Sequence, residues 1–567
     1  MSLTLYRNGS VYSAADPLAT AMLVDGDTVA WVGSEHAATS LADSRMRLVD
    51  LQGALITPGF VDSHVHVTET GLALESLDLT GARSLTQLLD LVESAATAPG
   101  RGGTANGPAG ERLASEPAGM ILGYGWDESN WPERRAPTAE ELERAGGGRE
   151  VYLARVDVHS AVVSAGLAAR CALAALDGWQ GTGTVVRAAH VAARAASRAL
   201  SSASRRSSQV RALSAAAAAG YVALVEMSAP QVGSAEDLSL LAELTAGSGT
   251  AAALPQVLPY WGQAVTSAEE ARTVLDALGT PVLGLAGDLN IDGSIGSHTA
   301  LLRKPYDDDP AQHGTQFLSV EQVADHLAAA SELGLQAGFH LIGDGAMDVA
   351  VEGLHRAAER VGIDKVRAAG HRFEHAEMAD AAAISALARH AVTVSLQPSF
   401  DALWGGSNGL YAARLGAERA RSLNPIAAFF AAGVPVCFGS DAPVTPLRPW
   451  ASVRACLQHH EPSQRISARA AFLGHTRAGW RAVRDSDPLM GQLVPGAPAS
   501  FAVWEVEELM VQVADQRVQS WSTDPRARTP LLPALDTGSD PVCLQTIHRG
   551  AELYRSPDFG ALSADVP

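Results

Sequence analysis

Residues 58–66 read Pro58-Gly59-Phe60-Val61-Asp62-Ser63-His64-Val65-His66. The apolar residues of this stretch give it the pattern of a buried β-strand. Side chains alternate between the two faces of a strand, so His64 and His66 point the same way. Two neutral imidazoles on one rigid strand are a good start for a divalent metal site. The stretch therefore predicts a strand that carries metal ligands, although a bare His-x-His pair also occurs among ordinary buried histidines.

Length and composition limit the class of protein. The chain has 567 residues, too many for one ordinary compact domain unless it is a large barrel with insertions. Lys and Arg number 42 and Asp and Glu 62, so the formal net charge is −20. An acidic chain without a basic stripe is a poor partner for nucleic acid.

The cysteines and the N-terminus bear on cellular location. The four cysteines form no CxxC pair, which is typical of a reducing compartment: Cys171, Cys437, Cys456 and Cys543. The N-terminal sequence lacks the apolar core of a signal peptide, and no apolar stretch is long enough to span a bilayer. We therefore expect a cytoplasmic protein without a membrane partner. The sequence leaves the oligomeric state open, with a homodimer as one alternative.

The middle of the chain alternates strand-like runs with Ala-rich helical stretches. Eight such runs can be counted: 59–67, 221–227, 254–260, 282–291, 335–342, 372–376, 392–398 and 434–440. This order predicts an α/β fold, a distorted (β/α)₈ TIM barrel over residues 58–486. Both ends of the chain show hairpin-like patterns. They predict a composite β-sandwich domain built from residues 1–57 and 487–567.

The gap between the first and second strands is too long for one crossover, so we expect an insertion at about residues 100–200. Its stretch Pro99–Glu111 is Gly-rich, and we expect it to be mobile. The stretch Arg187–Ala219 is rich in Ala, Ser and Arg, which is typical of a solvated helix or a flexible linker.

Barrel enzymes place their chemistry at the C-terminal ends of the strands. The strand ends of this chain carry Asp62, His64, His66, Glu226, Asp288, Asn290, Asp292, His340, His375, Gln397 and Asp441. A divalent metal held by imidazole and carboxylate groups, with one open position, lowers the pKa of its bound water toward neutrality. Asp441 is the expected base that takes the proton from this water. The set predicts metal-assisted hydrolysis of a C–N bond, and an ester would be cleaved with the same groups.

Two other motifs suggest different chemistry. His371-Arg-Phe-Glu-His375 matches the H-x-x-E-H of zinc peptidases, but that site needs a helix and this segment occupies the place of a strand. Gly405-Gly-Ser-Asn-Gly409 matches the G-x-S-x-G of a nucleophile elbow. That motif needs a strand directly before it, whereas these residues have the composition of a loop.

The strand-end residues stand in segments that carry a resemblance: PGFVDSHVH (58–66), GYGWDESNWPERRAPT (123–138), ARVDVHSAVVS (154–164), IDGSIGSHTALL (291–302), HLIGD (340–344), RFEHAE (372–377), SLQP (395–398) and GSDAPV (439–444). In this ordered set the chain resembles the amidohydrolase superfamily, in particular amidohydrolase family 3, which includes N-substituted formamide deformylases. The resemblance implies metal ligands at His64, His66, His340 and His375, with Asp441 as ligand and proton shuttle. It also implies a substrate pocket lined or covered by segment 123–138 and His159. The candidate substrate-binding residues are Trp126, Asp127, His159, Asp292 and Gln397.

One position departs from the family's pattern. The family usually has a carboxylated lysine that bridges two metals four residues before Asp292, and this chain has Asp288 there. Asp288 can itself bind or bridge metals, since a carboxylate is a hard oxygen ligand. Alternatively, the site holds a single metal, or catalysis is lost. Glu226 is another candidate carboxylate ligand, or a buried acid paired with a neighbouring donor.

We therefore expect a hydrolase acting on a non-peptide C–N bond of a small amide or formamide, with a small molecule as its substrate. One or two divalent ions would be bound, with zinc as the first expectation and iron or manganese as alternatives. A deaminase or esterase with the same site, and a catalytically altered barrel that binds a small ligand, are the alternatives. The sequence does not identify the substrate.

Overall fold

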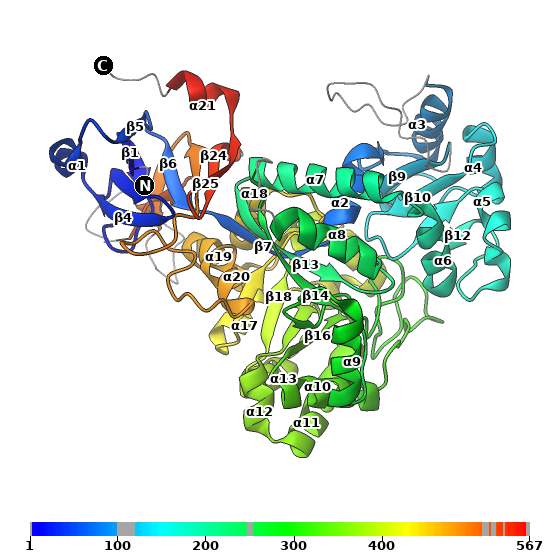
Figure 1. Ribbon diagram of the computed structural model, residues 1–567. Coiled ribbons are helices and arrows are strands. Elements are labelled where there is room, and N and C mark those ends of the chain that lie inside the picture. Colours follow the sequence, from blue (N-terminus) through cyan, green and yellow to red (C-terminus); the bar gives the residue numbers. More distant parts are fainter. Residues whose placement is uncertain are drawn as a thin grey trace.

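The computed structural model describes residues 3–98, 119–246, 253–512, 521–522, 529–536 and 539–562. The Gly-rich stretch Pro99–Glu111 lies outside the described residues. The chain has a mixed α/β fold, in which a central unit of strands and helices lies between the two chain ends on one side and the residues that follow the first central strand on the other (Figure 1). Among the described residues, none of the helices is both long and apolar enough to cross a bilayer.

All eight predicted central strands are present: β7 (Phe60–Val65), β13 (Tyr221–Ser228), β14 (Gln256–Trp261), β15 (Gly284–Leu285), β16 (Gln336–Leu341), β17 (Arg372–His375), β18 (Thr393–Leu396) and β19 (Val436–Phe438). They pair in parallel within two sheets, in the orders β14-β13-β7 and β15-β16-β17-β18-β19. Parallel pairing directs the carboxyl ends of neighbouring strands to the same edge of each sheet.

Backbone hydrogen bonds connect the two sheets at both junctions, and beside β7 they include one from His66 N to Ala442 O at 3.0 Å. Leu283 N donates to Pro259 O at 2.8 Å beside β14 and β15, and Asp441 N donates to His64 O at 2.8 Å beside β19 and β7. Between the described strands, the ladder of hydrogen bonds is interrupted at both places, so it does not close into one continuous sheet. β15 is shorter than the predicted strand 282–291. The chain turns after β15 at Gly287, where φ is 111° and an added Cβ would lie 2.5 Å from Ser228 O.

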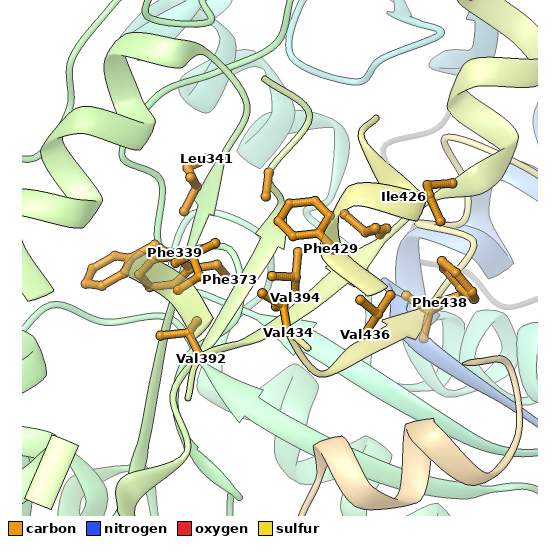
Figure 2. Packing of buried hydrophobic residues seen from close by; sticks show 14 of the residues in the cluster. Phe339, Leu341, Phe373, Val392, Val394, Ile426, Phe429, Val434, Val436 and Phe438 are labelled. Carbon is orange, nitrogen blue, oxygen red and sulfur yellow. The ribbon is translucent and has the colours of Figure 1, made fainter. Parts of the chain in front are cut away.

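Helices cover the outer side of the five-stranded sheet, among them α10 (Val320–Leu333), α11 (Asp344–Val361), α13 (Ala381–His390) and α17 (Ile426–Ala431). Apolar side chains of β16–β19 and α17 pack into this core (Figure 2). Phe339 and Leu341 belong to the core, whereas His340 between them belongs to the opposite face of β16. The alternation that builds the core therefore turns His340 toward the centre of the molecule.

The residues after β7 form a second α/β unit, drawn in blue and cyan in Figure 1. Its sheet has the order β12-β11-β10-β9-β8, from β8 (Leu77–Asp78), β9 (Ile121–Trp126), β10 (Val151–Arg155), β11 (Ala161–Val163) and β12 (Thr184–Val185). The helices beside it include α3 (Leu85–Thr97), α4 (Ala139–Ala145) and α5 (Ala165–Arg170). The stretch Arg187–Ala219 forms α6 (Arg187–Ser197) and α7 (Ser202–Ala218), both with buried inner faces. The helical alternative is confirmed for this stretch, and the linker alternative is wrong.

The two chain ends share one sheet. Its order is β2-β6-β20-β24-β25, from β2 (Ser10–Val11), β6 (Leu55–Pro58), β20 (Phe501–Glu505), β24 (Val542–His548) and β25 (Ala551–Arg555). A second sheet has the order β4-β3-β1-β5, from β1 (Leu3–Arg7), β3 (Ala21–Asp25), β4 (Thr28–Gly33) and β5 (Arg47–Asp50). Side chains of both sheets meet in one apolar cluster that includes Tyr6, Val29, Ile56 and Phe501.

Candidate metal centre

β7 carries His64, and His66 follows it as the residue before helix α2 (Val67–Glu75). The side chain of Asp62 fixes this strand against the segment after β19. Asp62 Oδ1 accepts hydrogen bonds from His64 N at 3.2 Å and Ser440 N at 2.8 Å, and Oδ2 accepts one from the Ser440 hydroxyl at 2.6 Å. Gly439 permits the close approach, because an added Cβ would lie 2.5 Å from His64 N.

The other residues of the centre come from β16, β17 and the segment after β19. His340 lies on β16, His375 is the last residue of β17, and Asp441 follows β19. His375 and Asp441 have φ angles of 71° and 56°, which non-glycine residues rarely adopt. This backbone turn ends the strand alternation, so Phe373 packs in the core whereas His375 faces the centre. Such strained residues concentrate at functional sites.

The structure brings the predicted histidines together. Asp441 Oδ1 lies 3.4 Å from His64 Nε2 and 3.3 Å from His66 Nε2. The ring centroid of His375 lies 4.9 Å from that of His64 and 4.4 Å from that of His340. His64, His375 and Asp441 offer ligand atoms that all lie within 4.8 Å of one another. Side chains from four strand ends thus converge on one buried point.

Asp288 lies between two pairs of histidines. Its Oδ1 atom is 3.7 Å from His64 Nε2 and 3.9 Å from His340 Nδ1, and its Oδ2 atom is 3.4 Å from His66 Nε2. Asp288 completes one group of ligand atoms with His64 and His66 and another with His340 and His375, each within 4.8 Å. A carboxylate in this position can serve ligand sets on both of its sides.

Hydrogen bonds orient three of the imidazoles. His64 Nδ1 pairs with Glu374 Oε2 at 2.8 Å, and His375 Nδ1 pairs with Gln397 Oε1 at 2.8 Å. In both rings this leaves Nε2 for another partner, as in metal-binding histidines whose second nitrogen donates to an acceptor. His340 Nε2 lies 3.3 Å from Gly293 O, which leaves Nδ1 of this ring for another partner. Gln397 is thus a partner of His375.

The donor set fits a divalent cation. His64 Nε2 and Asp288 Oδ1 are buried and have no hydrogen-bond partner among the described residues. Burial alone would lower the pKa of His66, but the Asp288 and Asp441 carboxylates outweigh it and raise the pKa to about 10. Burial, followed by the charge of His159, lowers the pKa of His340 to about 4. Imidazole and carboxylate groups together are ligands that zinc, iron and manganese accept.

A cavity opens onto this centre. His340, His375 and Asp441 border it, and its apolar walls come from Ile295, Ile342, Phe400, Trp404, Leu410 and Val444. His159 also borders the cavity, with its ring centroid 4.9 Å from that of His340. This apolar space beside a few polar groups has the character of a small-molecule site.

Sequence reasoning missed two acidic residues of this region. Glu374 orients His64 and is held in turn by Arg372 Nε at 2.6 Å. Glu377 borders the cavity, and burial raises the pKa of its carboxyl group to about 7. Both lie in the segment RFEHAE around His375, so their closeness to a candidate ligand was the available signal.

Comparison with known proteins settles the family. The sequence profile described as the amidohydrolase family matches residues 47–554, which is most of the chain. The chain belongs to the amidohydrolase family. It is therefore an enzyme, and the family resemblance of its motifs is confirmed.

Individual relatives align with this chain over most of their own length. The amidohydrolase is 25% identical to Protein LONG AFTER FAR-RED 3 of Arabidopsis thaliana, over 88% of this chain and 86% of that one. It is 22% identical to N-substituted formamide deformylase of Arthrobacter pascens, over 78% and 80%. A solved structure of an uncharacterized metal-dependent hydrolase from Pyrococcus furiosus matches with a TM-score of 0.64 and 25% identity, over 88% of this chain and 98% of that one.

Two of the candidate substrate-binding residues of the amidohydrolase, Trp126 and Asp127, bond to protein groups that are not part of the cavity lining. The Trp126 indole N–H donates to Leu153 O at 3.0 Å. Asp127 accepts a hydrogen bond from Arg155 Nη2 at 2.9 Å and another from Ser129 N at 3.0 Å. Neither is among the residues that line the cavity. Both side chains are engaged with protein groups in this structure.

Glu226 and Asp292 of the amidohydrolase are also occupied by protein donors. Glu226 accepts from Val67 N at 2.7 Å and from the Ser228 hydroxyl at 2.9 Å, and lies outside the groups of candidate ligands. It borders a second cavity that His66 also reaches. Asp292 accepts hydrogen bonds from three backbone amides, at Leu301, Ile342 and Gly343. This contact fixes the loop after β15 against the end of β16.

The structure excludes the two rival motifs in this amidohydrolase. Residues 372–375 form strand β17, so the H-x-x-E-H residues do not share a helix face. His371 instead accepts a hydrogen bond from Ala337 N at 3.0 Å and lies away from the centre. Residues 405–409 follow helix α14 (Pro398–Trp404), not a strand, so they form no nucleophile elbow.

Proposed function

We propose that this amidohydrolase hydrolyses a non-peptide C–N bond in a small amide or formamide. The convergence of four imidazoles and two carboxylates beside a small apolar cavity carries the proposal: His64, His66, His340, His375, Asp288 and Asp441. The relative named as a formamide deformylase supports this class of substrate.

Two overlapping ligand sets are proposed. His64, His66 and Asp288 would hold one divalent ion, and Asp288, His340 and His375 a second. A divalent ion in such a centre lowers the pKa of water and polarises a carbonyl group. Zinc is the proposed ion, because imidazole and carboxylate groups suit it, and iron and manganese are the alternatives.

Asp441 is proposed as the proton carrier, and it also borders the ligand sets. It contacts His64 and His66 on one side and borders the cavity on the other. Its carboxylate can therefore take the proton from the attacking water and pass it to the leaving nitrogen. Glu374 and Gln397 keep His64 and His375 in place, and His159 contacts the substrate from the cavity wall.

We also propose an architecture and a cellular location for the protein. We propose that the eight central strands represent a distorted (β/α)₈ barrel over residues 58–486, and that residues 1–57 and 487–567 form a composite β-sandwich. The backbone contacts at both sheet junctions and the sheet shared by the two chain ends support this view. A cytoplasmic location is proposed from the scattered free cysteines.

Elemental analysis combined with a hydrolase panel tests the function. The purified protein should contain one or two divalent ions per chain, lose activity after chelation and regain it when zinc, iron or manganese is returned. Formamides, amides, esters and amino-heterocycles should be compared, because released amine, alcohol or ammonia distinguishes amide hydrolysis from esterase or deaminase activity. A metal-free protein that gains no activity with any of these ions contradicts the proposal.

A further inference from the structure

Glu377 presents a carboxyl group to the cavity from the segment after β17. Its side chain is almost completely buried, and it borders the same space as His375 and Asp441. The Tyr411 hydroxyl donates a hydrogen bond to Glu377 Oε2 at 2.5 Å. The Asn424 side chain also acts on this carboxyl group, whereas none of the described residues donates a hydrogen bond to Oε1 within 3.5 Å.

Glu377 also lacks a compensating positive charge. Within the part of the chain that the structure describes, no Lys, Arg or His lies at ion-pair distance from its carboxyl group. The charged groups that act on it most strongly are Asp441 and Asp401, both acidic. A buried carboxylate without a cation is costly, so buried carboxylates are normally paired.

Asp157, another acidic residue on the cavity, shows the usual arrangement. Arg155 Nη1 lies 3.2 Å from its Oδ2 atom. The hydroxyl groups of Ser294 and Ser297 donate to the same oxygen at 2.7 Å each. Asp157 is therefore balanced by the protein, whereas Glu377 is left for something that enters the cavity.

We propose that Glu377 is a subsite for a positively charged nitrogen of the substrate, an ammonium or amidinium group. The inference rests on the proposed function and narrows its substrate class to small amides that carry such a cation. Tyr411 fixes one carboxylate oxygen, and the other receives an N–H group of the substrate. The apolar walls at Phe400, Trp404 and Leu410 contact its hydrocarbon part.

Binding of two small probes to the metal-loaded enzyme tests this subsite. n-Propylamine, which is protonated near neutral pH, and 1-propanol have similar size but differ in charge. Calorimetry should show that the wild-type protein binds propylammonium at least about tenfold more tightly, since hydrogen bonds between charged groups are stronger than those between neutral groups. Glu377→Gln should remove this preference. Glu140→Gln, an exposed substitution on α4, should retain it.

Several outcomes overturn the subsite. These are equal affinities in the wild-type protein, no binding of propylammonium, or a preference that Glu377→Gln leaves intact, as direct coordination of the amine by a metal would produce. Equal affinities of the wild-type protein for the two probes would overturn the subsite even where Glu377→Gln fails to fold. Hydrolysis is measured separately. Binding through Glu377 without hydrolysis of any amide contradicts the proposed function alone, and hydrolysis without a cation preference contradicts the subsite alone.

Discussion

At the scale of single residues, Asp288 and Asp441 approach the same histidines but differ in what else they contact. Both lie 3.3–3.4 Å from His66 Nε2. Asp441 additionally borders the cavity, whereas Asp288 reaches His340 at 3.9 Å on the other side of the centre. The surroundings of Asp441 therefore suit a proton carrier, and those of Asp288 suit a ligand shared by two ions.

Replacing Asp441 with Asn should remove the proton acceptor and leave most of the metal-binding set in place. Since general-base catalysis contributes roughly 10²–10⁴-fold, kcat should fall by about that factor. Steady-state hydrolysis and metal content measured on the same sample check this outcome. Turnover equal to that of the wild-type protein would exclude Asp441 as the base.

Replacing Asp288 with Ala should lower the number of metal ions per chain, because both proposed ligand sets lose a member. Elemental analysis after dialysis measures the change. Asp348→Ala, which alters an exposed residue of α11 that pairs with Arg303, is the matched control and should bind metal normally. Unaltered stoichiometry in the Asp288 variant would make its role structural.

The placement of His64, His66 and His340 was predictable from the sequence, because strand alternation and strand ends specify where such side chains point. His375 faces the centre because its positive φ ends the alternation, which the sequence does not indicate. For Asp288 the sequence left three alternatives open, a bridging ligand among them, and only contact geometry places it between the histidine pairs. Asp292 was predicted at the substrate, but its carboxylate is occupied by backbone amides of distant segments. The proposed role of Glu377 rests on the lack of a cationic side chain at ion-pair distance among the described residues, and no local sequence pattern predicts that lack.

At the scale of secondary-structure elements, all eight central strands were predictable and their lengths were not. β15 has two residues because Gly287 turns the chain. The sheet after β7 escaped prediction, since residues 127–150 separate β9 from β10 and only composition marked this region as an insertion. Pairing between distant segments leaves little local signal.

His371 connects β17, β16 and α10 and gives this contact a dependence on pH. Its Nδ1 accepts from Ala337 N at 3.0 Å, and its Nε2 pairs with the Ser331 hydroxyl at 2.9 Å, which requires a neutral ring. Burial, followed by the charge of His326, lowers the pKa of His371 to about 3. In the unfolded chain the histidine pKa is about 6.5. Between these values the unfolded state binds the extra proton, so acidification destabilises the fold.

The variant His371→Asn should therefore respond less to acid. Below about pH 6.5, the free energy of unfolding of the wild-type protein should decrease by about 1.4 kcal/mol per pH unit more than that of the variant. Urea denaturation at a series of pH values measures both slopes. Parallel slopes would show that His371 takes up its proton in the folded state as well.

At the scale of the whole molecule, the two chain ends depend on each other. β6 from the N-terminal region pairs with β20 from the C-terminal region, and the rings of Tyr6 and Phe501 pack edge to face with centroids 5.3 Å apart. The β6 strand leads directly into β7, which carries His64. The shared sheet thus supports the strand that begins the metal centre.

Phe501→Ala should destabilise this shared sheet by about 3–5 kcal/mol, the usual cost of removing a buried phenylalanine ring. Limited proteolysis should then cut residues 3–33 faster, and urea denaturation should show the loss. Phe317→Ala, at a side chain that is 44% exposed, should change little. Equal protease resistance of the wild-type protein and the Phe501 variant would contradict the mutual support of the chain ends.

The central claim is that distant histidines share a cation, and a crystal structure of the zinc-loaded enzyme with anomalous diffraction at the zinc absorption edge tests it most directly. We expect anomalous peaks about 2.0–2.2 Å from ligand atoms of His64, His66, His340 and His375, with Asp288 in contact with the ion or ions. The absence of a peak among these side chains, or zinc bound only elsewhere, would contradict the account.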